Sequence, residues 1–189
     1  MKSLIKVTMA LFLIAGTSSV TFAQASDEKT VMVGGAAMYP SKTIVENAVN
    51  SKDHTTLVAA VKAAGLVETL SGDGPFTVFA PTNAAFEKLP AGTVETLLKP
   101  ENKEMLTKIL TYHVVAGKVS AEQLAGLIKA GNGKAELSTV SGGKLVASLK
   151  GKNVILTDEK GGTATVTIKD VNQKNGVIHV IDHVVLPKS

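Results

Sequence analysis

The sequence predicts one α+β domain, with helices in its first half and an antiparallel sheet in its second. The chain has 189 residues, a length that supports a single hydrophobic core. Apolar residues recur at helical spacing between Ile44 and Ile128. From Ala135 onward, glycine-containing turn signals instead separate short β-rich runs. Both halves are therefore expected to pack around one shared core.

Four apolar stripes predict four helices in the first half. Asp53 is expected to cap the second helix and Gly65 to end it. Pro100 suits the first turn of the third helix, and Ser120 with Gln123 forms a capping box before the fourth. The stripes are Ile44, Val45, Ala48 and Val49; Leu57, Ala60, Val61 and Ala64; Met105, Leu106, Ile109 and Leu110; and Leu124, Leu127 and Ile128.

A short strand and a short helix are predicted among these helices. The run Phe76–Ala80 is rich in strand-forming residues, and Pro81 is expected to end the strand. Thr82 or Asn83 can cap the helix that follows, whose Phe86 returns to the core.

The second half predicts a meander of hairpins. Asn175-Gly176 is its strongest turn signal, because both residues accept the positive φ of a type I′ turn. For that reason Gly176→Val is expected to destabilise the domain strongly. The predicted strands are 135–140, 144–149, 153–156, 163–171 and 177–186.

The N-terminus has the pattern of an export signal. A basic start with Lys2 and Lys6 precedes the apolar run Val7–Ala15, and Ala23-Gln24-Ala25 fits a cleavage site. Residues 1–25 are therefore predicted to be a signal peptide, with an uncleaved anchor as the alternative. Residues 26–40 are expected to form an arm, 41–187 the domain, and no other stretch is long enough to span a membrane after cleavage.

Composition excludes several classes of function. The absence of cysteine excludes disulfides and thiolate chemistry. All 20 basic residues are lysine, the net charge is +4, and aromatic residues make up 4% of the chain. Without arginine forks or stacking aromatics, a nucleic-acid surface is not expected.

Histidines are the candidate groups for chemistry near neutral pH. His54 is expected at the surface or as a cap, and His113 in the interior with a hydrogen-bond partner. His179 and His183 lie four residues apart in a predicted strand, which places their Cα atoms about 13 Å apart. No metal, cofactor or catalytic residue is predicted. A hydrolase or metal enzyme that uses His113 with His179 or His183 stays as an alternative, and Asp158-Glu159 is interpreted as a solvated turn.

Three segments together resemble the signature of the fasciclin domain family. The first block runs from Phe76 to Phe86, the Tyr-His block is Tyr112-His113-Val114-Val115, and the terminal block runs from Asn175 to Pro187. Their order and separation also match, and the similarity spans residues 41–187. The resemblance implies a β-wedge of two antiparallel sheets flanked by several helices.

The resemblance also implies candidate contact residues. Tyr112 and His113, together with the stretch Lys169, Asp170 and Val171, match segments linked to integrin contact in animal members. The remaining block residues are interpreted as determinants of the fold: Phe76, Phe79, Pro81, Thr82, Asn83, Phe86, Asn175, Gly176 and His179.

The resulting functional hypothesis is an exported, non-enzymatic interaction module, secreted, periplasmic or at the cell surface. Its expected partner is a surface or matrix protein or a polysaccharide, in adhesion or biofilm contact, and the protein itself is expected to be a monomer or a weak oligomer. The alternative hypothesis is a carrier of a small apolar ligand, held in a cleft between the helices and the sheet.

Overall fold

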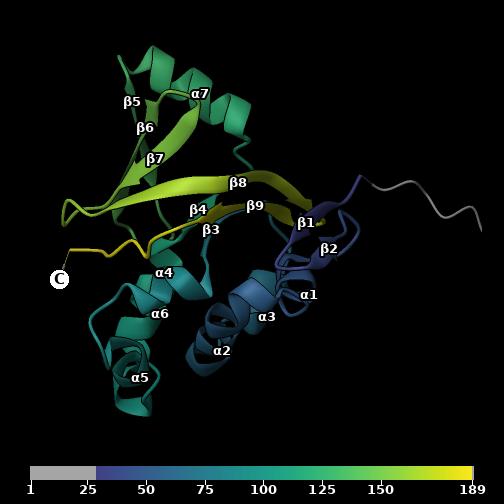
Figure 1. Cartoon of the computed structure of the whole chain (residues 1–189), viewed down its shortest axis with the longest axis vertical. Helices are drawn as coiled ribbons and strands as arrows, with labels where there is room; N and C mark the ends of the chain where they lie inside the picture. The colour runs from purple at the N-terminus through teal and green to yellow at the C-terminus, as the bar shows by residue number, and fades with distance from the viewer. Residues whose placement is uncertain (1–28, 189) are drawn as a thin grey trace, which may run out of the picture.

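The computed structural model describes residues 29–188 and confirms the α+β class. Figure 1 shows the helices that precede Val114 gathered on one side of a long curved sheet, with the helix Ala121–Ala130 beside the strands at the other end. The predicted signal peptide lies outside the described residues. Among residues 29–188, no helix is long and apolar enough to cross a membrane.

The elements follow the predicted order, with some additions. The helices are α1 (Ile44–Ala48), α2 (Thr55–Ala64), α3 (Val67–Ser71), α4 (Asn83–Glu87), α5 (Thr93–Leu97), α6 (Lys103–Tyr112) and α7 (Ala121–Ala130), with 3-10 turns at Lys52–His54 and Pro100–Asn102. The strands are β1 (Val31–Val33), β2 (Ala36–Met38), β3 (Phe76–Pro81), β4 (Val114–Ala116), β5 (Lys134–Ser138), β6 (Lys144–Lys150), β7 (Asn153–Thr157), β8 (Thr163–Gln173) and β9 (Gly176–Ile181). Helices α3 and α5 are short and were not predicted.

The main sheet has the strand order β4-β3-β9-β8-β7-β6-β5. Strands β5 to β9 form the predicted antiparallel meander. Strand β3 pairs with β9 in parallel, so one pair departs from the all-antiparallel expectation. The two ends of the sheet meet, because Val115 bridges Thr139 and the Val140 N–H donates to the Val114 carbonyl at 2.8 Å. The sheet is thus curled almost into a barrel.

Strands β3 and β9 separate two hydrophobic cores, so the expectation of one shared core is wrong. Side chains alternate along a strand: Val78 and Ile178 face the core under the helices, whereas Phe79 and Ile181 face the interior of the curled sheet. Because both faces are covered, every residue of β9 is buried. This double burial explains the near-continuous apolar run of the terminal block.

Helix capping is confirmed in part. Thr82 caps α4 by accepting from the Ala85 N–H at 3.3 Å, and the predicted Ser120 capping box is present. Asp53 does not cap α2. Instead, the Asn83 side chain accepts from the Thr56 N–H at 3.0 Å, a contact between residues 27 positions apart that spacing cannot reveal.

The predicted type I′ turn at Asn175-Gly176 is wrong. Gln173 pairs with Gly176, so the two turn residues are Lys174 and Asn175. Neither Asn175 nor Gly176 has a positive φ. Glycine is needed here for space, because a Cβ at position 176 would lie 2.0 Å from the Phe76 backbone oxygen.

The described part of the N-terminal arm packs on the helical core. Strands β1 and β2 pair as a hairpin, and it buries Val33 and Met38 against that core. Asn47 of α1 holds the end of this hairpin by exchanging two hydrogen bonds with the Tyr39 backbone, at 3.0 and 2.8 Å.

Candidate functional site: the Tyr-His block and its surroundings

Tyr112 ends helix α6 with its side chain inside the curled sheet. The residue is fully buried. Its hydroxyl donates to the Lys144 carbonyl at 2.6 Å and accepts from the Glu159 N–H at 3.2 Å. Burial raises the pKa of Tyr112 to about 12. The hydroxyl is therefore a neutral structural link between α6, β6 and the β7–β8 turn.

His113 caps the same helix end and is 2% exposed. Its Nδ1 donates to the Ile109 carbonyl at 2.8 Å, and its Nε2 accepts from the Val185 N–H at 3.2 Å. These partners require the Nδ1–H tautomer. Burial lowers the pKa of His113 to about 4, so the ring is neutral at pH 7. The predicted interior position with a partner is confirmed.

His179 is held in the opposite tautomer. The ring is 1% exposed and stacks on Phe79 at 5.7 Å between centroids. Its Nε2 donates to the Val119 carbonyl at 2.9 Å, while its Nδ1 accepts from the Asp170 N–H at 3.3 Å. Burial is the main cause that lowers the pKa of His179. The ring links β9, β8 and the loop that precedes α7.

The stretch Lys169, Asp170 and Val171 lies at an irregularity of the β8–β9 pairing. Asp170 has a φ of +58°, and its Oδ1 accepts from the N–H of Ala121, the first residue of α7, at 2.7 Å. Val171 is buried, Asp170 is half-buried and Lys169 is exposed. Among the five candidate contact residues, Lys169 is thus the exposed one. The partner-binding roles remain a prediction, and the burial of Tyr112 and His113 leaves no side-chain surface for direct contact in this fold.

Asn175 joins three segments in the interior. Its Nδ2 donates to the carbonyls of Leu70 and Gly72, both at 2.9 Å, and its Oδ1 accepts from the Ile44 N–H at 3.0 Å. The side chain therefore satisfies the first N–H of α1 and carbonyls at the end of α3. The turn prediction assigned Asn175 a local role, whereas its contacts are long-range.

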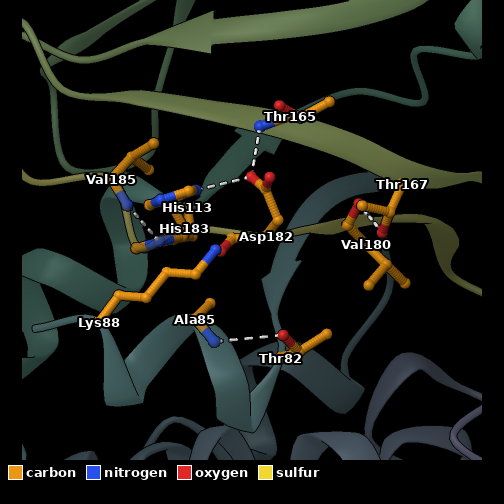
Figure 2. Close-up of polar contacts among 10 residues, drawn as sticks. All are labelled: Thr82, Ala85, Lys88, His113, Thr165, Thr167, Val180, Asp182, His183 and Val185. Carbon is orange, nitrogen blue, oxygen red and sulfur yellow. Dashed lines mark hydrogen bonds and ion pairs between the residues drawn. The ribbon is translucent and has the colours of Figure 1, made fainter.

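The segment after β9 crosses the end of α6 without regular structure. Figure 2 shows Asp182 accepting from the Thr165 N–H and from His183, at 2.6 and 2.9 Å. Lys88 donates to the Asp182 carbonyl at 2.8 Å. Burial alone would raise the pKa of Asp182, but hydrogen bonds from His183 and Thr165 outweigh it and lower that pKa. His183 lies beyond the end of β9, so its predicted strand position is wrong.

Two further expectations about polar residues are wrong. Asp158 is buried rather than solvated, because its carboxylate accepts from the N–H groups of Lys160, Gly162 and Leu186 at 2.7–2.9 Å. His54 is 3% exposed, bonds Ser51 Oγ through Nδ1 at 2.9 Å, and caps no helix with its side chain. Burial lowers the pKa of His54.

The structure does not assemble these groups into a centre for chemistry. His113 and His183 both bond the segment after β9, at Val185 and Asp182. His179 instead bonds Val119 and Asp170. Among residues 29–188, no group of three or more histidine, aspartate or glutamate side chains is placed to hold a metal ion. Two apolar cavities do lie between the helices and the sheet, near Leu57 and Val78, with volumes of about 40 and 30 Å³. Ligand pockets are typically about 300–1,000 Å³, so this space does not favour the carrier hypothesis.

Comparisons with known proteins agree with the fold. The chain is 52% identical over 160 residues to "Protein sll1483" of Synechocystis sp., covering 85% of this chain and 82% of the relative. It is 33% identical over 160 residues to the "Cell surface glycolipoprotein MPB83" of Mycobacterium bovis, covering 82% and 64%. A solved FAS1 domain pair from the insect cell adhesion molecule Fasciclin I superposes with a TM-score of 0.70 at 18% identity, covering 78% of this chain and 52% of that chain.

The family assignment rests on a match to most of the chain. The model of the fasciclin domain matches residues 52–187, a range that holds all three signature blocks. With the curled sheet, the buried Tyr-His block and the shared FAS1 fold, this match shows that the chain belongs to the fasciclin domain family.

Proposed function

We propose that this protein is an exported, non-enzymatic interaction module that acts in adhesion or matrix contact at the cell surface. The observation that carries the proposal is the internal use of the polar groups in the signature blocks. Tyr112, His113, His179 and Asn175 direct their polar atoms to backbone groups of the domain. Such groups hold a scaffold together and are not free to act on a substrate.

The absence of exposed, activated groups among these residues supports a non-enzymatic role. A general base must reach the proton that it abstracts and needs a pKa near the working pH. Burial lowers the pKa of His113 to about 4, and one of its ring nitrogens already donates while the other accepts. A hydrolase that uses His113 would have to break both bonds first.

The cell-surface location is supported by the sequence and by the relatives. Residues 1–25 have the pattern of a signal peptide. A relative that is 33% identical is named a cell surface glycolipoprotein, and the superposed insect structure belongs to a cell adhesion molecule. The proposed partner is a protein or polysaccharide of the surface or matrix.

Deletion combined with surface crosslinking tests the proposal. A deletion strain is compared with a strain complemented by the full chain, and crosslinked complexes are recovered from intact cells. Reduced attachment or altered matrix on deletion, restored by the complement and accompanied by a surface partner, is the expected result. Unchanged attachment and matrix, with no partner recovered, would contradict it.

The location is measured in the same strains. Fractionation should place the mature chain outside the cytoplasm, with its N-terminus at Ser26. An intact N-terminus in the cytoplasmic fraction would contradict export, whatever the outcome of the attachment assay.

A further inference from the structure

The outer face of α6 and the C-terminal segment form a groove outside the Tyr-His block, and the terminal block reaches it only with its last two residues, Leu186 and Pro187. The groove has a volume of about 380 Å³ and is lined mainly by these two segments and by the β7–β8 turn. We call it the α6–tail groove. In Figure 1 this region lies at the left, where the C-terminal segment passes above α6. Its volume is within the range typical of ligand sites.

The floor of the α6–tail groove is apolar. Met105, Ile109, Leu186 and Pro187 line it. Met105 is 56% exposed although it lies in the apolar stripe of the helix, because the stripe is wider than the face that α6 buries. An exposed, flexible thioether side chain can adapt to ligands of varied shape.

The rim of the groove is cationic. Lys108, Lys160 and Lys188 line it, and all three are exposed. Within residues 29–188, none of them forms an ion pair with a carboxylate. Lys108 also donates to the Lys188 carbonyl at 3.2 Å, which holds its ammonium at the groove.

Two acidic residues reduce this positive charge without cancelling it. Glu104 also lines the groove. Glu159 is held by the backbone N–H groups of Lys188 and Lys144, and these bonds, with the charges of Lys108 and Lys188, lower its pKa. The carboxylate of Glu159 is thereby directed to the backbone.

A second groove extends the same face. It has a volume of about 400 Å³, shares Glu104 and Lys108 with the first, and adds Lys103. The hydroxyl-bearing residues Thr107, Thr111 and Ser141 complete its lining. The Thr107 and Thr111 hydroxyls donate to backbone carbonyls of α6. The lysines are thus the groups that recur along this face, and their spread suits a linear polymer better than a compact ligand.

We infer that the α6–tail groove and its extension bind an acidic polysaccharide through lysine–carboxylate pairs over an apolar floor. This inference rests on the proposed function and names the chemical class of its partner. Neutral glycans are less suited, because Tyr112 is buried and Tyr39 is the tyrosine with an exposed ring. Lysine charges are strongly hydrated and do not form arginine's planar fork, so each contact is weak and affinity depends on many contacts along the polymer.

Affinity electrophoresis of the mature full chain tests the inference. The probes are polygalacturonate, with one carboxylate per sugar, and uncharged dextran; sedimentation with phosphatidylglycerol vesicles is measured in parallel. The groove variant K108Q/K160Q/K188Q is compared with K134Q/K150Q/K152Q, which removes the same charge from exposed positions at the start of β5 and the β6–β7 hairpin tip. Thermal melting confirms that both variants are folded.

Wild type should be retarded by polygalacturonate and not by dextran. Raising the salt from 0.01 to 0.1 M should release it, because the Debye length falls from about 30 to about 10 Å. The groove variant should bind roughly tenfold more weakly and the matched variant within about twofold of wild type, since each exposed pair contributes only a modest part of the affinity.

Three outcomes would overturn the inference: no retardation by polygalacturonate, equal loss in both variants, or lysine-dependent binding to anionic lipid vesicles instead. Each is distinguishable from failure of the proposed function. If deletion impairs attachment and a surface protein is crosslinked while polygalacturonate is not bound, the interaction role holds and the polysaccharide assignment is wrong.

Discussion

The two faces of helix α6 serve different purposes. The inner face and the helix end bury Leu106, Leu110, Tyr112 and His113. The outer face exposes Met105 and Lys108 to a groove. Tyr112 and His113 belong to this first face and helix end, and Val114 and Val115 continue the Tyr-His block into β4. Residues that identify the family in the sequence can therefore be those that build the domain, while the proposed binding surface lies mostly on neighbours outside the Tyr-His block.

The polar groups on the two faces also differ in how much they contribute to folding stability. Removing one partner of a buried hydrogen bond leaves the other unsatisfied, at a cost of about 1–3 kcal/mol. Exposed lysines near the groove contribute little to folding, because water solvates them in either state. Substitutions of the buried, hydrogen-bonded side chains should thus lower the free energy of unfolding, and substitutions in the groove should alter binding alone.

The largest loss of stability is expected at Gly176, where the backbones of β3 and β9 come close. Gly176→Ala places a Cβ 2.0 Å from the Phe76 backbone oxygen, at the start of the parallel β3–β9 pair. The strands must separate, so we expect loss of the folded state or a destabilisation above about 4 kcal/mol. The control is Gly126→Ala, which meets no atom within 4 Å on α7 and should be neutral or stabilising. Circular dichroism and urea unfolding measure both; equal stability would contradict the assigned packing.

Asn175→Ala should cause the second-largest loss of folding stability. It removes three hydrogen bonds and leaves the Ile44 N–H and two carbonyls without their partner, so we expect a loss of roughly 3 kcal/mol. Asn172→Ala is the matched control, because Asn172 is exposed and its side chain bonds the Asp170 carbonyl at 3.2 Å. A loss below about 1 kcal/mol at position 175 would show that these contacts do not join the helices to the turn.

Lowering the pH should reduce the contribution of the buried histidines to the free energy of unfolding. The pKa of His113 is lowered from 6.5 to about 4 in the fold, so the unfolded chain binds a proton that the folded chain excludes. Its contribution is therefore complete above about pH 6.5 and is lost as the pH falls toward 4, on the order of 3 kcal/mol. Burial lowers the pKa values of His54 and His179 in the same direction.

Urea unfolding at pH 7, 5.5 and 4 measures this dependence. The free energy of unfolding should fall steadily with pH, and a folded His113→Gln variant should show a shallower fall. His183→Gln, at a partly exposed position, is the matched control for the loss of a histidine outside the core. A stability independent of pH over this range would mean that the buried rings are not excluded from water.

A smaller effect is expected for Tyr112→Phe. The substitution keeps the ring in the core and removes the hydroxyl from the Lys144 carbonyl and the Glu159 N–H, at about 1–2 kcal/mol. Tyr39→Phe is the control, since that residue is 40% exposed and should change stability by less than about 0.5 kcal/mol. Comparable losses in both would contradict the interior role of the Tyr112 hydroxyl.

Local patterns predicted much of the fold, because periodicity and turn residues report the burial of nearby positions. The helical stripes, the β5–β9 meander and the Ser120 capping box followed from residues close in sequence. The parallel β3–β9 pair did not, since it joins residues one hundred positions apart. The same reason explains the missed cap of α2 by Asn83 and the burial of Asp158.

The candidate site was less predictable than the fold. The resemblance named Tyr112 and His113, but only the contacts of their hydroxyl and ring nitrogens show how they are used. The α6–tail groove has no local signature, because helix α6, the β7–β8 turn and the C-terminal segment meet there only in the folded chain. Met105 belongs to the predicted apolar stripe but is 56% exposed. Periodicity shows which residues share a helix face, and does not show how much of that face is buried.

The central claim is that His113 and His179, the buried histidines of the signature blocks, are neutral and hydrogen-bonded inside the domain. Long-range ¹H–¹⁵N NMR of their imidazoles tests it most directly. At pH 7 the folded full chain should show opposite neutral tautomers, with the proton on Nδ1 in His113 and on Nε2 in His179. Spectra in which both rings are protonated, or in which both exchange rapidly between tautomers as free imidazoles do, would contradict it.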